Sequence, residues 1–133
     1  MVSVKKYIRL NKTTHSIIEE HPLIIRIEST SGEFAEVEDI YAMRDANNEL
    51  SQGKPFCVLL DTTAGFASST PEANQLLASK EFSGNRQAIA IIAKSLASKI
   101  VSNFFIRFNK PHTPTRVFTN EQKAIDWLKE IFR

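Results

Sequence analysis

Hydroxyl side chains cluster directly after an apolar run, residues 56–60, that ends in an acid. The acid is Asp61, and the segment after it supplies Thr62, Thr63, Ser68, Ser69 and Thr70. Ligands of open α/β sheets gather beyond the carboxyl ends of central strands. A hydroxyl at the start of a helix can also carry a phosphate, because the helix dipole and the free N–H groups favour negative charge. These six residues are therefore a candidate regulatory, phospho-accepting loop; the alternative is plain helix capping.

A second candidate site lies in a stretch without acidic residues, between Glu81 and Glu121. Residues 1–81 hold 8 Lys/Arg and 12 Asp/Glu, whereas residues 82–133 hold 9 and 3, so the second part is strongly basic. Two prolines fold the chain back within this stretch and could bring its cations together. The candidate anion-binding residues are Arg107, Lys110, His112 and Arg116. The alternative is a set of ordinary solvated side chains.

Motifs of catalytic and cofactor sites are absent from the sequence. Its four glycines do not form a phosphate-binding loop or a dinucleotide fingerprint. His15, His21 and His112 lack the spacing that places two imidazoles on one helical face for a metal. The single cysteine, Cys57, lies in an apolar run, so no internal disulfide or cysteine cage can form. We therefore predict no cofactor and no metal.

The strands and helices that must position these residues alternate along the chain. Runs rich in β-branched residues predict strands over 22–27, 56–61, 87–93 and 115–118. Helical spacing predicts helices over about 37–50 and from residues 71, 96 and about 120. The strand over 56–61 lacks polar alternation, which is typical of a strand buried on both faces, and we expect it to be central.

Local signals place the ends and the faces of the helices. The second helix is predicted to begin at a cap formed by Thr70, or by Ser69 in a capping box with Glu72. Before the last helix, Thr119 and Gln122 have the spacing of a capping box. In the third helix Leu96, Ile100 and Phe104 recur every four residues, the spacing of an amphipathic helix. The last helix is predicted to bury Ala124, Ile125, Leu128 and Ile131.

The composition and the element order predict one α/β domain over residues 1–133. A chain with 42% hydrophobic and 24% charged residues can form a packed core. We expect a mixed, mostly parallel sheet of about five strands, with an N-terminal antiparallel hairpin and about four helices. No apolar run is long enough for a signal peptide or a membrane span, so we expect a cytoplasmic protein.

Short motifs in the last third of the chain are distinctive. They are Asn103-Phe104-Phe105, Phe108–Pro111, Pro114–Thr119 and Ala124–Leu128. Through these motifs and the order of its elements, the chain resembles a bacterial family of small proteins with a STAS-like fold, the fold of anti-sigma-factor antagonists. The resemblance implies a STAS-like domain. In regulatory STAS proteins a partner kinase phosphorylates the serine of an Asp-Ser pair after a central strand; here Thr62 follows Asp61.

Several functions stay open at this point. The leading hypothesis is a non-enzymatic regulatory or interaction module that binds a protein partner through residues 62–70 and the helix that follows. The alternative is a domain that binds a small ligand or anion, such as a lipid headgroup or phosphate. The third hypothesis is an enzyme that uses Asp61 for acid–base chemistry, although no second titrating residue is evident beside it. No recognition motif favours nucleic acid, and a homodimer is a further alternative.

Overall fold

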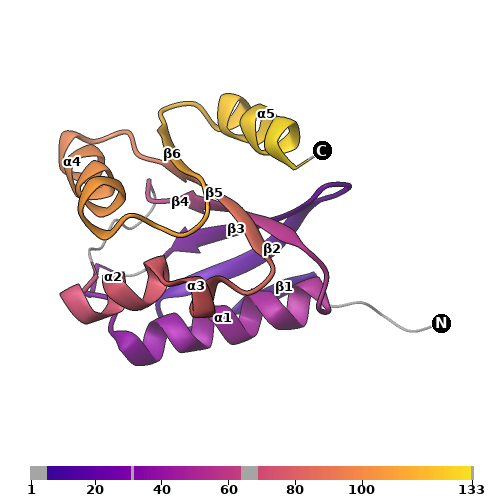
Figure 1. Cartoon of the computed structure of the whole chain (residues 1–133), viewed down its shortest axis with the longest axis horizontal. Coiled ribbons are helices and arrows are strands. Elements are labelled where there is room, and N and C mark those ends of the chain that lie inside the picture. The colour runs from indigo at the N-terminus through magenta and orange to yellow at the C-terminus, as the bar shows by residue number, and fades with distance from the viewer. Residues whose placement is uncertain (1–5, 31, 64–68, 133) are drawn as a thin grey trace.

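Six strands form one sheet in which each strand lies beside the next in sequence. The computed structural model of the chain, shown in Figure 1, describes residues 6–30, 32–63 and 69–132. The strands are β1 (Tyr7–Arg9), β2 (Thr13–Glu20), β3 (Leu23–Ser29), β4 (Phe56–Asp61), β5 (Arg86–Ile92) and β6 (Thr115–Phe118). The first three strands pair antiparallel, and β3 to β6 pair parallel. The sheet is therefore mixed, with the predicted antiparallel hairpin at its N-terminal side.

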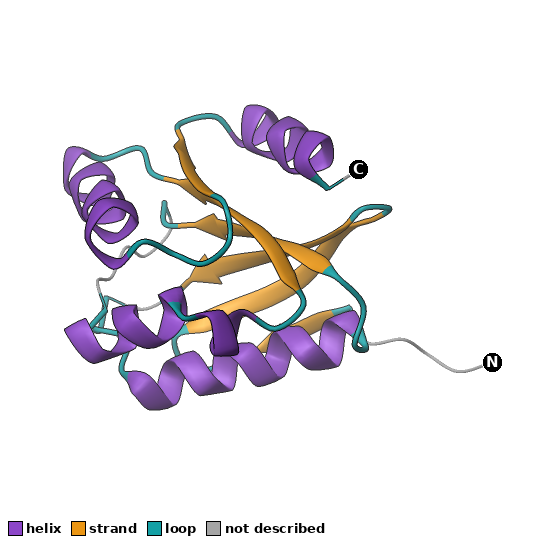
Figure 2. Ribbon diagram, viewed as in Figure 1, coloured by secondary structure: helices purple, strands orange, loops and turns teal. Residues whose placement is uncertain are grey.

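Helices cover both faces of this sheet, and one helix closes its end. Figure 2 shows α5 (Glu121–Ile131) on one face, with α1 (Val37–Ser51), α2 (Pro71–Ala78) and α3 (Lys80–Ser83) on the other. The helix α4 (Leu96–Phe104) lies at the end of the sheet where β4 finishes, and a π-helical turn, η1 (Phe105–Asn109), continues it. None of the helices in the described ranges is long and apolar enough to cross a lipid bilayer.

The central strand β4 is buried on both faces, as its unbroken apolar run predicted. Cys57 and Leu59 point to the face that α5 covers, where they pack with Ala124 and Leu128. Val58 points to the opposite face and packs with Leu50 of α1. Burial raises the pKa of Cys57 to about 12, so its thiol is protonated and packs as a small apolar group.

Helix ends and element counts differ in detail from the sequence-based expectation. The sheet has six strands because the short β1 pairs with β2, and the described residues form five α-helices. The Thr70 hydroxyl caps α2, as predicted. Asn120, and not Thr119, caps α5, because its side chain reaches the N–H of Lys123 at 3.0 Å.

The buried stripe of α5 is also narrower than predicted. Ala124 and Leu128 are fully buried and Ile125 is partly buried, whereas Ile131 is exposed. Ile131 lies in the last turn of the helix. Trp127 packs beside the stripe, with its ring 5.6 Å from that of Phe118 on β6. The two aromatic rings thus attach α5 to the last strand of the sheet.

Candidate functional site

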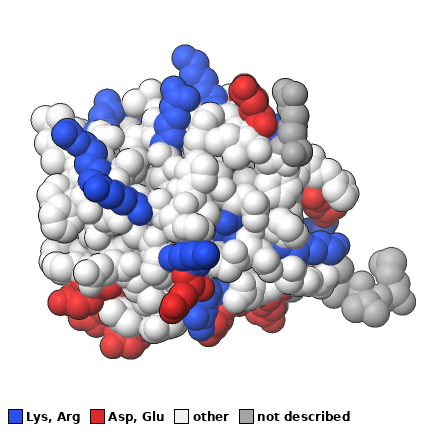
Figure 3. Space-filling model, viewed as in Figure 1, with Lys and Arg blue, Asp and Glu red and all other residues white. Residues whose placement is uncertain are grey.

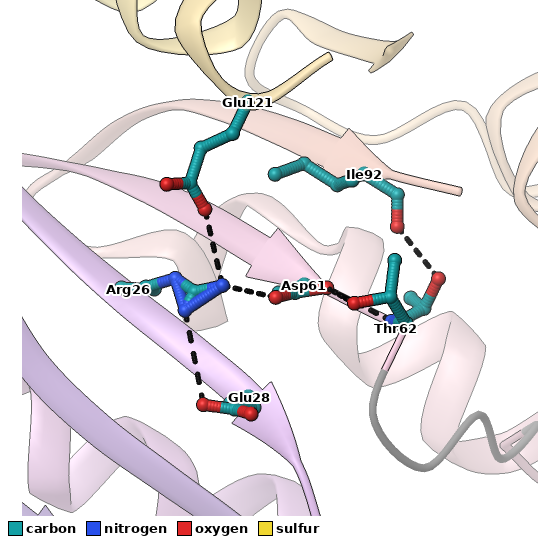
Figure 4. Close-up of polar contacts among 7 residues, drawn as sticks. Arg26, Glu28, Asp61, Thr62, Ile92 and Glu121 are labelled. Atoms are coloured by element: carbon teal, nitrogen blue, oxygen red, sulfur yellow. Dashed lines mark hydrogen bonds and ion pairs between the residues drawn. The ribbon is translucent and has the colours of Figure 1, made fainter. Parts of the chain in front are cut away.

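Arg26 of β3 is the centre of a polar cluster at the end of β4 (Figure 4). Its guanidinium forms an ion pair with Asp61, the last residue of β4. The same group lies 3.0 Å from a carboxylate oxygen of Glu121, at the start of α5, and 3.7 Å from one of Glu28. The parallel register of β3 and β4 sets Glu28 beside Asp61, so both acids lie within reach of the arginine. The cluster joins two strands and a helix that are far apart in sequence.

The second oxygen of Asp61 is also occupied. It accepts hydrogen bonds from the backbone N–H of Thr63 at 2.8 Å and from its hydroxyl at 2.6 Å. Burial raises the pKa of Asp61, but the Thr63 hydrogen bonds and the charge of Arg26 outweigh this effect, so the pKa lies below its ordinary value. A carboxyl group held ionised by these donors stabilises the end of β4 and has no proton to give near neutral pH.

The hydroxyls of Thr62 and Thr63 are both engaged. The Thr62 side chain is buried, and its hydroxyl donates to the carbonyl oxygen of Ile92 on β5 at 2.6 Å. The Thr62 N–H bonds the same oxygen at 3.1 Å, which continues the pairing of β4 with β5. Thr63 is exposed, but its hydroxyl is turned toward Asp61.

The remaining loop candidates lie at the start of α2. Thr70 accepts a hydrogen bond from the N–H of Ala73 at 3.2 Å and so caps the helix. Ser69 forms an isolated backbone bridge with Ala35. Ser68 lies outside the described residues. A role for these hydroxyls as phosphate acceptors stays a prediction.

The four predicted anion-binding residues are all exposed. Arg107 lies in η1, and Lys110 follows it in a left-handed backbone conformation with φ of 49°. Arg116 of β6 stacks on the ring of Phe118, 5.1 Å from its centroid. In the described part of the chain, no hydrogen bond or ion pair links Arg107, Lys110, His112 and Arg116. An anion site formed by these four residues stays a prediction.

Helix α4 has its apolar side chains on the outside. Leu96, Ile100, Phe104 and Phe108 are 76%, 59%, 58% and 71% exposed, and we name this set the apolar ridge. The buried residues of α4 are instead Ser98 and Ser102. The spacing of four residues did predict one apolar side. Only the tertiary packing shows that this side faces away from the protein.

The apolar ridge borders a groove along the start of α2. Ser69, Pro71, Glu72, Asn74, Gln75, Ile100, Val101, Phe104, Phe108 and Asn109 line this groove. The rings of Phe104 and Phe108 are stacked, with their centroids 5.0 Å apart and an interplanar angle of 11°. The two rings therefore form one flat aromatic surface beside the groove.

Cations flank the other side of the ridge. Lys99 and Arg107 line a shallow depression there, together with Asn103 and ridge residues. Figure 3 shows basic side chains toward the end of the molecule where α4 lies, and acidic ones along the edge formed by α1. The exposed apolar surface is thus combined with positive charge.

Metal ligands are not gathered in the part of the chain that the structure describes. Among residues 6–30, 32–63 and 69–132, no three His, Cys, Asp or Glu side chains are placed to hold a metal ion. The sequence alone did not single out Arg26, which is partly buried, or Arg86, which is buried. The sequence did contain a signal for both residues, because each is a lone arginine in an apolar run rich in β-branched residues. Arg26 lies within the run 22–27, and Arg86 lies at the start of the run 86–93.

Comparison with known proteins agrees with the observed fold. Residues 17–132 match the family described as "Domain of unknown function (DUF7793)". No curated protein matches the chain. A similar solved structure is that of an uncharacterized protein of the DUF3478 family, with a SpoIIAA-like fold, from Shewanella loihica PV-4. It is 16% identical with a TM-score of 0.64, over 91% of this chain and 97% of that chain. This likeness confirms the STAS-like fold, and the chain belongs to the DUF7793 family.

Proposed function

We propose that this chain is a non-enzymatic interaction module that binds an amphipathic segment of a protein partner on the apolar ridge of α4 and η1. The observation that carries the proposal is the inverted arrangement of α4. Its buried side is formed by small serines, and its exposed side by Leu96, Ile100, Phe104 and Phe108. An exposed apolar patch with a polar rim is typical of an interaction surface.

The ridge has enough apolar surface to contribute substantially to binding. Full burial of a Leu, Ile or Phe side chain stabilises by about 1.5 to 3 kcal/mol. Ordering the partner offsets part of this gain, so we expect a moderate affinity. The stacked pair of Phe104 and Phe108 is the expected centre of the contact, since large aromatic side chains dominate interface energetics.

The groove and the cations define the chemistry of the partner. A groove between two helices accepts the apolar side of a third helix, whose anchors recur at i, i+3, i+4 and i+7. Lys99 and Arg107, on the far side of the ridge, favour acidic residues on the flank of that helix. A second copy of this chain fits less well, because it would bring the same cations to the interface.

The regulatory part of the proposal rests on Ser69, which lines the groove just before α2. A phosphate on this residue would place negative charge beside the bound segment. An acidic partner would then be repelled from the groove. Modification in this loop would therefore weaken binding without any large structural change.

The test uses two designed helical peptides of about 16 residues, labelled with fluorescein. Both carry leucines at i, i+3, i+4 and i+7, and the flanking positions are glutamate in one peptide and lysine in the other. We expect fluorescence anisotropy to show at least about tenfold tighter binding of the acidic peptide to the wild type. The double variant Phe104→Ser, Phe108→Ser should lose this binding.

The matched control is Phe34→Ser, which removes an equally exposed aromatic ring that is not part of the ridge. This variant should bind the acidic peptide as the wild type does. Equal binding of both peptides, or unchanged binding by the double variant, would contradict the proposal. Ridge-dependent sedimentation with anionic vesicles in the absence of peptide binding would identify a membrane surface instead. Ridge-dependent dimerisation in analytical ultracentrifugation would identify a second copy.

A further inference from the structure

A partly open cavity of about 110 Å³ lies between the sheet and the helices α1, α2 and α3, at the end that α4 closes. Its floor is formed by apolar side chains of β3, β4 and β5, including Ile27, Val58 and Ile91. Its other walls include Met43 of α1 and Leu77 of α2. Interiors of proteins normally have few voids larger than a water molecule. A space of this size between the sheet and its helices is therefore a candidate binding site.

The inverted arrangement of α4 helps to explain why this space exists. The helix turns Ser102 toward the sheet, and Val101 and Phe105 line the cavity on either side of it. A serine at the centre of this wall fills much less volume than the Leu, Ile and Phe side chains on the outer side. The residues that could have filled the cavity form the apolar ridge instead.

The wall of the cavity carries positive charge and no negative charge. The polar lining residues are Arg44, Asn47, Thr62, Ser69, Asn74, Ser102 and Arg86. None of the described lining residues is an Asp or a Glu. A cavity with an apolar body and a few fixed polar groups is typical of a small-molecule site, and here those groups favour an anion.

Arg86 is the strongest indication of the ligand. The residue is 5% exposed, yet no carboxylate pairs with it in the described part of the chain. Its Nε donates to the Thr113 hydroxyl at 3.3 Å, and Nη2 donates to the carbonyl oxygen of Leu77 at 3.1 Å. Among the described residues, Nη1 has no acceptor. Burial lowers the pKa of Arg86 to about 10, so the group is a buried cation at neutral pH.

Asn47 adds a further polar group to the wall. The amide oxygen of Asn47 is occupied by His15 at 2.8 Å, while its amide nitrogen has no acceptor in the described part of the chain. A carboxylate can accept about four hydrogen bonds, and an arginine binds it through a two-point contact.

We propose that this cavity binds a small monocarboxylate whose acid group pairs with Arg86 and whose short apolar tail lies against the sheet. The volume of about 110 Å³ limits the tail to about four carbons, since a larger cavity of about 150 Å³ accommodates the six carbons of benzene. The proposal does not depend on the function assigned to the ridge.

The groove beside the ridge is the route into the cavity. Ser69, Asn74 and Val101 line both the groove and the cavity, so the two spaces meet between α2 and α4. A small separation of these two helices would admit the ligand. An occupied cavity would in turn hold α4 in place.

The test measures binding of pentanoate to the full chain by isothermal titration calorimetry and saturation-transfer NMR. Pentanamide and pentylamine have nearly the same size and are the uncharged and cationic controls. We expect pentanoate to bind at least about tenfold more tightly than either control and to raise the melting temperature. Arg86→Met keeps most of the side-chain volume, removes the charge and should abolish the preference for pentanoate.

A second pair of variants keeps the test decisive if Arg86→Met does not fold. Ser102→Leu fills the cavity while Arg86 is retained, and Ser102→Ala keeps the cavity open. Pentanoate should bind to Ser102→Ala and not to Ser102→Leu. The proposal is overturned if the cavity takes up water only, so that no pentanoate binds. Equal binding of the three probes, or full binding by folded Ser102→Leu, would overturn it as well.

Discussion

Asn47 of α1 accepts a hydrogen bond of 2.8 Å from Nδ1 of His15 on β2, across 32 positions of the sequence. Because an amide oxygen can only accept, Nδ1 carries the hydrogen, and Nε2 accepts from the Thr13 hydroxyl at 2.8 Å. Burial lowers the pKa of His15 and outweighs the opposite effect of the Asn47 hydrogen bond. The imidazole is therefore neutral, and it attaches α1 to the sheet beside the cavity.

The neutral state of His15 makes stability depend on pH. The folded protein resists protonation of this imidazole, whereas the unfolded chain takes up the proton below about pH 6.5. Stability should therefore fall as the pH drops from about 7 to 5. In His15→Gln this part of the slope should disappear from urea-unfolding measurements. The exposed His112 supplies the control, because His112→Gln should keep the wild-type slope. If His15→Gln keeps the wild-type slope as well, burial of His15 does not cause the pH dependence of stability.

Asp61 should control stability in a lower pH range. Its pKa is lowered by folding, so its ionised form stabilises the protein at neutral pH, and this contribution is lost as the pH falls below about 4. We expect Asp61→Asn to cost about 1 to 3 kcal/mol at pH 7, since it weakens hydrogen bonds made to a charged group. The difference from the wild type should shrink toward about pH 3. Asp45→Asn, at an exposed position of α1, is the control and should change little.

Leu59 tests the core beneath α5. It is fully buried in β4, and Leu59→Ala should lower the free energy of unfolding by about 2 to 5 kcal/mol. Leu96→Ala makes the same chemical change at a position that is largely exposed. Its free energy of unfolding should stay within about 0.5 kcal/mol of the wild type. Chemical denaturation followed by Trp127 fluorescence measures both, and similar losses in the two variants would contradict the assigned burial.

Removal of residues 120–133 tests the dependence of the fold on α5. The helix covers one face of the sheet through Ala124 and Leu128. Without it, Ile24, Cys57 and Leu59 would be exposed to water, and we expect aggregation or loss of cooperative melting. Ile131→Ser changes an exposed residue of the same helix and should melt as the wild type does. A truncated chain that melts cooperatively at the wild-type temperature would show that the sheet does not need this cover.

Local sequence determined most of the elements. The unbroken run at 56–60 predicted a strand buried on both faces, because a strand without polar alternation has no side for water. Thr70 and Pro71 together predicted the start of α2, since both act within one turn of backbone. The short motifs near the carboxyl end pointed to the STAS-like fold, which the structural comparison confirmed.

Only the tertiary structure decided how these elements use their side chains. The spacing of Leu96, Ile100 and Phe104 defines one apolar side of a helix, but not the direction in which that side points. Arg26 forms ion pairs with Asp61 and Glu121, which lie 35 and 95 positions later in the chain. Arg86 has no such partner among the described residues and faces a cavity instead. Pairing, burial and empty space depend on contacts between distant segments, and such contacts exist only once the sheet and its helices have packed.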